Sequence, residues 1–142
     1  MKRFLFILIL GVNLFAGERV VTLSPSINEI VFALGEGKSV VANTRFCDFP
    51  EESKYIKKIG GYNNISLEKI LEVKHTVVIG QDYDNKLNDN LNALNIKTLI
   101  YKTNTISSIK NTINDLGVFF KKEEKAKELT SNIDNALLSL DS

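Results

Sequence analysis

The residue types that most often carry enzyme chemistry are scarce and scattered in this chain. His75 is the single histidine and Cys47 the single cysteine, and they lie far apart in the sequence. A cysteine nucleophile needs an adjacent base, and zinc needs three or four clustered ligands. Asp82 and Asp84 come closest to a carboxylate pair, but residues two apart in a loop usually face water. We therefore predict no enzyme, no metal site and no resident cofactor, with Cys47 as a small buried thiol.

The stretch 35–39, GEGKS, looks at first like the end of a nucleotide-binding loop. Such a loop needs a glycine four residues before the Gly-Lys-Ser and a helix after it. Phe32 stands at the glycine position, and the residues after Ser39 form an apolar run. The stretch is therefore interpreted as a turn from a helix into a strand.

Aromatic and polar side chains suited to binding follow the predicted strands instead. If these strands are parallel, the loops after them collect along one edge of the sheet, where ligands gather in open α/β folds. Exposed aromatics on such loops would form a shallow platform for a large, flat ligand. For each aromatic alone, local packing is an equal alternative. The aromatic residues in question are Phe46, Phe49, Tyr62 and Tyr83.

The elements that would position these loops alternate between two periodicities. Short apolar runs predict strands, and amphipathic segments with apolar residues three or four apart predict helices between them. This alternation favours an α/β fold with three layers, in which helices flank a central parallel sheet of about four to five strands. The expected strands are 19–23, 39–43, 76–80 and 97–101; the expected helices are 26–35, 65–73, 84–95 and 105–120.

The two ends of the chain differ from this α/β segment. Residues 1–16 begin with Lys2 and Arg3, continue with about a dozen apolar residues and end at Ala16, as in a secretory signal peptide. An uncleaved membrane anchor is the alternative. No cysteine follows for lipid attachment, so we expect a soluble periplasmic protein. Residues 121–142 predict a long amphipathic helix with no glycine stop, which suggests an architecture that continues.

The overall charge gives no reason to expect a nucleic-acid partner. The chain has 142 residues, of which 44% are hydrophobic, 25% are charged, and the formal net charge is +1. This is the composition of an ordinary globular domain. Cleavage after residue 16 would change the net charge to −1, because it removes two basic residues and no acidic ones.

A series of short motifs in register resembles one protein family. "RVVTLSPSINEI", "CDFP", "GGYNNISLEKI" and a Lys-x-x-VVI strand follow one another as in the N-terminal lobe of periplasmic binding proteins that serve ABC importers for cobalamin, ferric siderophores and haem. The resemblance covers the chain from about Arg19 onward. It implies an N-terminal lobe at 17–120 and the start of a helix connecting to a second lobe at 121–142, so the chain looks truncated.

The resemblance also implies roles for particular residues. Glu68 would dock the lobe onto basic residues of the permease. Gln81 replaces a tryptophan of some cobalamin binders, so the ligand stays open between cobalamin, a ferric siderophore and haem. The expected ligand-binding residues are Ser24, Pro25, Ser26, Phe46, Asp48, Tyr62, Gln81 and Tyr83.

Two functions from different classes follow as expectations. The first is a solute-binding lobe whose partners are the ligand, an ABC importer permease and a separately encoded second lobe. The second is a truncated, exported α/β interaction module that binds no ligand of its own. A small flavodoxin-like enzyme is disfavoured, because it would need a phosphate-binding loop.

Overall fold

The computed structural model describes residues 17–82 and 84–142, so the predicted signal peptide and Tyr83 lie outside the described residues. Its centre is a parallel sheet of five strands in the order β3-β2-β1-β4-β5. The predicted α/β class with four to five parallel strands is confirmed. The strands are β1 (Val20–Thr22), β2 (Val40–Asn43), β3 (Lys57–Lys58), β4 (Val77–Gln81) and β5 (Thr98–Tyr101).

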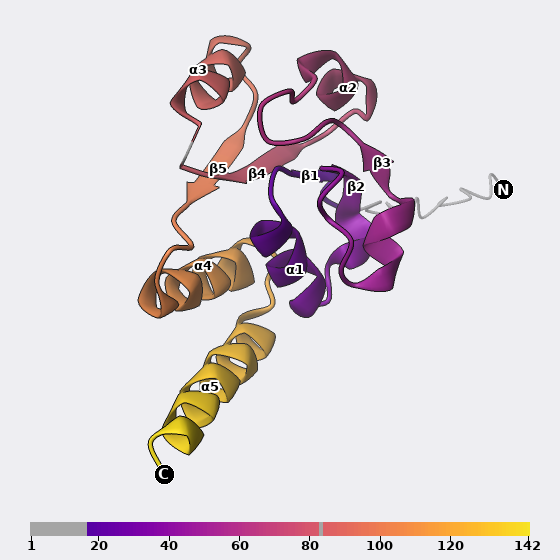
Figure 1. The fold of residues 1–142 in the computed structure, drawn as a ribbon. Helices are drawn as coiled ribbons and strands as arrows, with labels where there is room; N and C mark the ends of the chain where they lie inside the picture. The colour runs from indigo at the N-terminus through magenta and orange to yellow at the C-terminus, as the bar shows by residue number, and fades with distance from the viewer. Residues whose placement is uncertain (1–16, 83) are drawn as a thin grey trace, which may run out of the picture.

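Helices cover both faces of this sheet, which gives three layers. In Figure 1, α1 and α4 lie on one face of the sheet, and α2 and α3 lie on the other. The helices are α1 (Pro25–Ala33), α2 (Leu67–Glu72), α3 (Asn85–Ala93), α4 (Ile106–Phe119) and α5 (Glu123–Leu140), with the short 3-10 turns η1 (Gly37–Ser39) and η2 (Glu51–Tyr55).

Two apolar clusters form the core, one on each side of the sheet. Val20 and Ile79 pack toward α1 and α4, whereas their neighbours Val21 and Val78 pack toward α2 and α3. All four side chains are fully buried. Burying one such side chain stabilises the fold by about 1.5–3 kcal/mol. The strands are therefore continuous apolar runs, because successive side chains enter different clusters and neither face meets water.

Local signals begin and end these helices within two residues of the predicted bounds. The Ser24 hydroxyl accepts a hydrogen bond from the Ile27 amide at the start of α1, and Ser66 does the same for α2. Gly35 follows α1 with φ +85°, a conformation that costs glycine little. The stretch 35–39 is confirmed as a turn that leads through η1 into β2.

Two features were not foreseen from the sequence. β3 consists of Lys57 and Lys58, which pair with Ala42 and Asn43 at the edge of the sheet. Two lysines carry no apolar signal for a strand. Asp84 serves as the N-cap of α3 through a 2.9 Å hydrogen bond from the Leu87 amide, rather than as half of a carboxylate pair.

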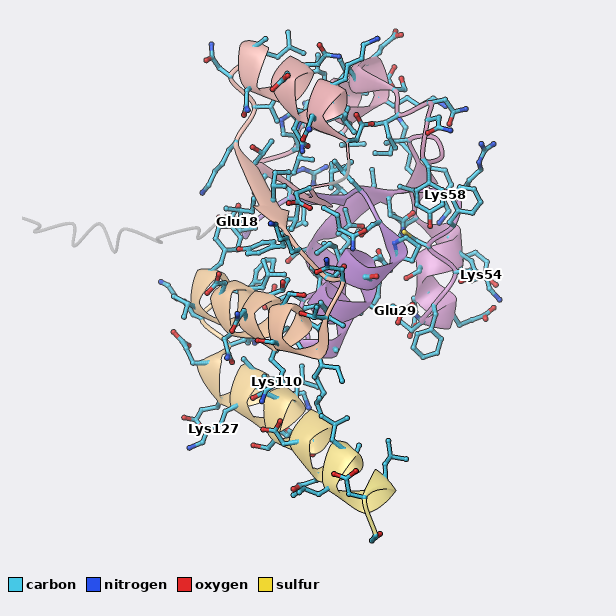
Figure 2. All side chains as sticks on the ribbon, turned by 60° about the vertical axis from the view of Figure 1, so that its left-hand side comes forward. Glu18, Glu29, Lys54, Lys58, Lys110 and Lys127 are labelled. Carbon is cyan, nitrogen blue, oxygen red and sulfur yellow. The ribbon has the colours of Figure 1, made fainter. Side chains whose placement is uncertain are left out.

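α5 runs away from the layers as a helix of its own (Figure 1). It joins α4 where Gly117 leaves no space for a side chain, because a Cβ there would lie 2.5 Å from Ala126 Cβ. Figure 2 shows Lys110 of α4 next to α5, and its Nζ lies 2.6 Å from Asp134 Oδ1. Leu138 and Leu140 at the far end are exposed. Within residues 17–82 and 84–142, no helix combines the length and apolarity needed to span a bilayer.

Candidate ligand-binding rim

The loops that follow the strands meet at one edge of the sheet, because all five strands run parallel. We call this edge the rim. It consists of the segments after β1, β2, β3, β4 and β5, namely 23–26, 44–50, 59–64, 82 and 84, and 102–104. Ligands of open α/β folds bind at this edge.

Two aromatic side chains from different loops form a stacked pair on the rim. The ring centroids of Phe46 and Tyr62 are 4.6 Å apart and the rings are inclined by 15°. The two residues are 42% and 45% exposed. We call this pair the aromatic platform. Stacked aromatics that stay open to solvent provide a flat apolar face on which another planar group can lie. The sequence predicted both residues here, but not their mutual contact.

Beneath the 44–50 loop, a buried hydrogen-bond network centres on Asn28 of α1. Its amide oxygen accepts from Thr22 Oγ1 at 3.1 Å and Asn43 Nδ2 at 3.2 Å. Its amide nitrogen donates to Ser53 Oγ at 2.7 Å and to the Phe49 carbonyl at 3.2 Å. Asn28, Thr22, Asn43 and Ser53 are all fully buried. The network ties two strands, a helix and η2 to the loop that carries Phe46.

Lys58 of β3 adds a cation to this network, close to η2 (Figure 2). Its Nζ donates to Asn43 Oδ1, the Cys47 carbonyl and the Ser53 carbonyl, at 2.7, 2.9 and 2.7 Å. Partial burial lowers the pKa of the Lys58 ammonium below the usual lysine value, because removing a charged group from water disfavours the charged form. The three ammonium protons each have an acceptor. Because two of the acceptors are the carbonyls of Cys47 and Ser53, Lys58 holds both ends of the 47–53 segment in place.

Cys47 belongs to the interior of the same loop, as expected. Its side chain is 1% exposed, and its Sγ lies 3.3 Å from Thr44 Oγ1. Burial raises the pKa of the Cys47 thiol above its usual value, so this sulfur is a poor nucleophile and a poor metal ligand at neutral pH. Among the described residues, no group of three or more His, Cys, Asp or Glu side chains is placed to hold a metal ion.

The 59–64 loop presents Tyr62 through a backbone conformation that glycine adopts readily and other residues do not. Gly60 has φ +128°, and a Cβ on it would lie 2.2 Å from the Asn64 carbonyl oxygen. The Gly61 amide donates to Asn64 Oδ1 at 2.7 Å. The Gly60 carbonyl accepts from the Arg45 amide at 2.9 Å. This last bond joins the two loops of the aromatic platform.

The remaining predicted site residues differ in how far a ligand could reach them. Ser24 is buried and its hydroxyl caps α1, so its contribution is to hold the loop. Pro25 is half-buried, whereas Ser26 and Asp48 are exposed. Gln81 is half-buried and its side-chain amide donates to Thr103 Oγ1. These assignments stay predictions, as does Tyr83, which the structure does not describe.

A small polar pocket lies at the β4–β5 end of the rim. It has a volume of about 260 Å³ and is lined by the ends of both strands and the loop after β5. A larger cavity of about 540 Å³ lies at the opposite edge, beside Gly37 and Val40. We assign the rim rather than this cavity as the candidate site, because the stacked aromatics and their buried supports are at the rim. The polar pocket residues are Gln81, Asp82, Tyr101, Lys102, Thr103 and Asn104.

Solved structures of other proteins share this fold. A crystal structure of a periplasmic haem-binding protein from Pseudomonas aeruginosa matches with a TM-score of 0.80 at 17% identity, covering 86% of this chain and 45% of that one. The periplasmic vitamin B12-binding protein of Vibrio cholerae matches with a TM-score of 0.78 at 25% identity, covering 87% of this chain and 49% of that one.

Proteins of similar sequence carry the same kinds of name as these structures. The vitamin B12-binding protein of Salmonella typhimurium is 30% identical over 137 residues, which cover 94% of this chain and 50% of that protein. The corresponding protein of Vibrio vulnificus is 31% identical over 104 residues, or 72% of this chain and 38% of that protein. The chain thus spans about half the length of the curated relatives it matches. A family model for periplasmic binding proteins matches residues 20–142, so the chain belongs to the periplasmic binding protein family.

Proposed function

We propose that this chain is the N-terminal lobe of a periplasmic solute-binding protein that captures cobalamin, a ferric siderophore or haem for an ABC importer. The observation that carries the proposal is the stacked, exposed pair Phe46 and Tyr62 at the ligand edge of the sheet. Both named classes of relative, for vitamin B12 and for haem, bind large flat ligands. The role is one of binding and delivery and needs no catalytic group.

The rim offers one face to such a ligand. Binding sites for small molecules usually enclose about 70–90% of the ligand surface, whereas Phe46 and Tyr62 are still 42% and 45% exposed. We propose that residues 121–142, which include α5, begin the helix that leads to the second lobe. The second lobe would supply the opposite wall of the site.

Titration of the isolated chain tests this proposal. With one wall of the site, the chain should bind cyanocobalamin, haemin and ferric siderophores with dissociation constants weaker than micromolar. Isothermal calorimetry and absorbance titration measure these constants. A submicromolar constant for any of the three would show that a single lobe already encloses its ligand, contrary to the proposal.

A docking role for Glu68 makes a separate prediction. Glu68 is exposed in the first turn of α2, where a carboxylate can meet basic permease residues. Charges at the periphery of a protein interface act mainly by steering the two proteins together. The variant Glu68→Lys should weaken association with the importer severalfold, and more at low salt than at high salt. The affinity of this variant for ligand at the rim should stay unchanged. Surface plasmon resonance on the reconstituted importer measures the association.

The matched control is Glu124→Lys on α5, which is also exposed and lies outside the α/β layers. It should leave permease association unchanged. Equal effects of the two substitutions would mean that net charge, and not a docking contact, is being measured. A fall in ligand affinity with Glu68→Lys would show that the docking assignment is wrong.

An exported interaction module without its own ligand is the second candidate. An apolar groove of about 300 Å³ between α1, α4 and α5 is lined by Ile30, Ile113 and Ile133, and Leu138 and Leu140 are exposed nearby on α5. Exposed apolar surface of this kind marks sites of protein interaction. This candidate predicts that no ligand binds at the rim.

A further inference from the structure

The cavity of about 540 Å³ at the edge opposite the rim has apolar walls from three parts of the fold. Phe32 belongs to α1, Val40 begins β2, and Ile56 follows η2. Val40 is buried, and the partly buried Phe32 and Ile56 pack against the core cluster that contains it. The core therefore holds these walls in place. The cavity volume lies within the range of about 300–1,000 Å³ that is typical of small-molecule sites.

Two glycines contribute to the same cavity without filling it. Gly35 and Gly37 both line it. Nothing lies within 4 Å of the position of a Cβ on Gly35, whereas a Cβ on Gly37 would lie 2.4 Å from two ring carbons of Phe32. The Phe32 ring therefore lies directly against the Gly37 backbone, and a side chain at position 37 would displace the ring.

Lys38 and Glu52 bring opposite charges to this cavity. Both side chains line it, and both residues are exposed. Lys38 belongs to η1 and Glu52 to η2, so the two charges come from different segments. Within residues 17–82 and 84–142, neither side chain forms an ion pair or a hydrogen bond.

The charged residues next to these two along the chain already have partners. The Glu36 carboxylate lies 3.6 Å from the Lys122 ammonium. The Glu51 carboxylate lies 2.8 Å from the Lys54 ammonium. The cavity thus combines an apolar interior with one ammonium and one carboxylate that no neighbouring group of the described chain neutralises.

We propose that this cavity is a second small-molecule site, and that its ligand is a free amino acid with a large apolar side chain. The apolar side chain of the ligand lies against Phe32, Val40 and Ile56, where it is removed from water. The ligand carboxylate meets the Lys38 ammonium, and the ligand ammonium meets the Glu52 carboxylate. The site lies at the opposite edge of the sheet from the rim, so this inference goes beyond the proposed function and does not depend on it.

Three compounds that share a phenyl group and differ in charge test the inference. L-phenylalanine carries an ammonium and a carboxylate, 3-phenylpropionate carries only the carboxylate, and phenethylamine carries only the ammonium. Each would be titrated at neutral pH into labelled residues 17–142, and backbone amide shifts would be followed by NMR. Phenylalanine should shift the amides of 35–40 and 52–56 with a dissociation constant of about a millimolar or tighter.

Phenylalanine should bind about threefold more tightly than either singly charged compound, which is the scale of one partly exposed ion pair. Lys38→Gln should weaken phenylalanine and 3-phenylpropionate and leave phenethylamine unchanged, because only a carboxylate meets Lys38. Glu52→Gln should weaken phenylalanine and phenethylamine and leave 3-phenylpropionate unchanged. Lys127→Gln and Glu124→Gln, at exposed positions of α5, are the matched controls and should change none of the three affinities.

Gly37→Ala tests the apolar wall separately from the charges. It should weaken all three compounds, because the Phe32 ring must move to make room for the new Cβ. Shifts that do not saturate, or that centre on other segments, would overturn the inference. Affinities that Lys38→Gln and Glu52→Gln change no more than the α5 controls would overturn it as well. The rim is titrated with different ligands, so either result leaves the proposed function standing.

Discussion

Replacing Asn28 with alanine should lower the free energy of unfolding by about 2–4 kcal/mol, because the change leaves several buried polar groups without a hydrogen-bond partner. The alanine removes the acceptor of Thr22 Oγ1 and Asn43 Nδ2 and the donor to Ser53 Oγ and the Phe49 carbonyl. Thr22, Asn43 and Ser53 are fully buried, so water cannot replace the lost partner without opening the fold.

Urea denaturation followed by circular dichroism measures this loss. The midpoint should fall while the dependence of the free energy on urea concentration stays the same. Asn90→Ala is the matched control, since Asn90 is an exposed helix residue of α3, and it should change stability by less than about 0.5 kcal/mol. If the two variants were equally stable, the network would not hold the 44–50 loop in the way described.

Replacing Gly60 with alanine should cost about 3 kcal/mol, since the side chain meets both backbone strain and a steric clash. At φ +128° an L-residue is strained, and the new Cβ would lie 2.2 Å from the Asn64 carbonyl oxygen. To relieve the clash the 59–64 loop must move, and the bond from the Arg45 amide to the Gly60 carbonyl moves with it. The stacked geometry of Phe46 and Tyr62 should be lost together with stability.

Gly35→Ala separates the two causes. Gly35 also has positive φ, +85°, but nothing lies within 4 Å of the position of a Cβ. Its alanine variant should cost only about 1 kcal/mol and leave the aromatic platform intact. Chemical denaturation gives the two costs, and Tyr62 ring resonances in NMR spectra report the stacking. Equal costs would show that the Asn64 contact does not constrain the loop.

Much of the architecture could be predicted because its signals are local. Four of the five strands are apolar runs, and Ser24, Ser66 and Gly35 mark helix ends by their own backbone chemistry. β3 could not be predicted in this way. It is two lysines long, and its strand character comes from pairing with β2, which lies far away in the sequence.

The candidate site was predictable in position but not in detail. That Phe46 and Tyr62 belong to the same edge follows from parallel strands, whereas their 4.6 Å stacking depends on how two separate loops fold back. The Asn28 network was missed, although one signal was available. Asn28 is a polar residue next to Ile27 and three positions before Val31, on the apolar side of α1, where a buried side chain needs hydrogen-bond partners. The packing of Arg45 against Gly61 was also not foreseen, because the two residues lie in different loops.

The interior and the surface of the lobe have different roles. The buried network of Asn28, Asn43 and Lys58 fixes the loops, whereas Phe46 and Tyr62 are partly exposed on the rim. The apolar groove beside α5 lies elsewhere on the molecule, so contacts with further protein need not compete with the rim.

The most direct test of the central claim is to map by NMR where ligands bind on the labelled chain. Cyanocobalamin, haemin and a ferric siderophore would be titrated separately into residues 17–142 while backbone amide shifts are followed. We predict fast-exchange shifts for at least one ligand, confined to the 44–50 and 59–64 loops and the ends of β4 and β5, and strongly reduced by Phe46→Ala. Shifts centred on the cavity at the opposite edge or on α5, or no shifts with any ligand at millimolar concentration, would contradict the claim that the rim is the ligand face.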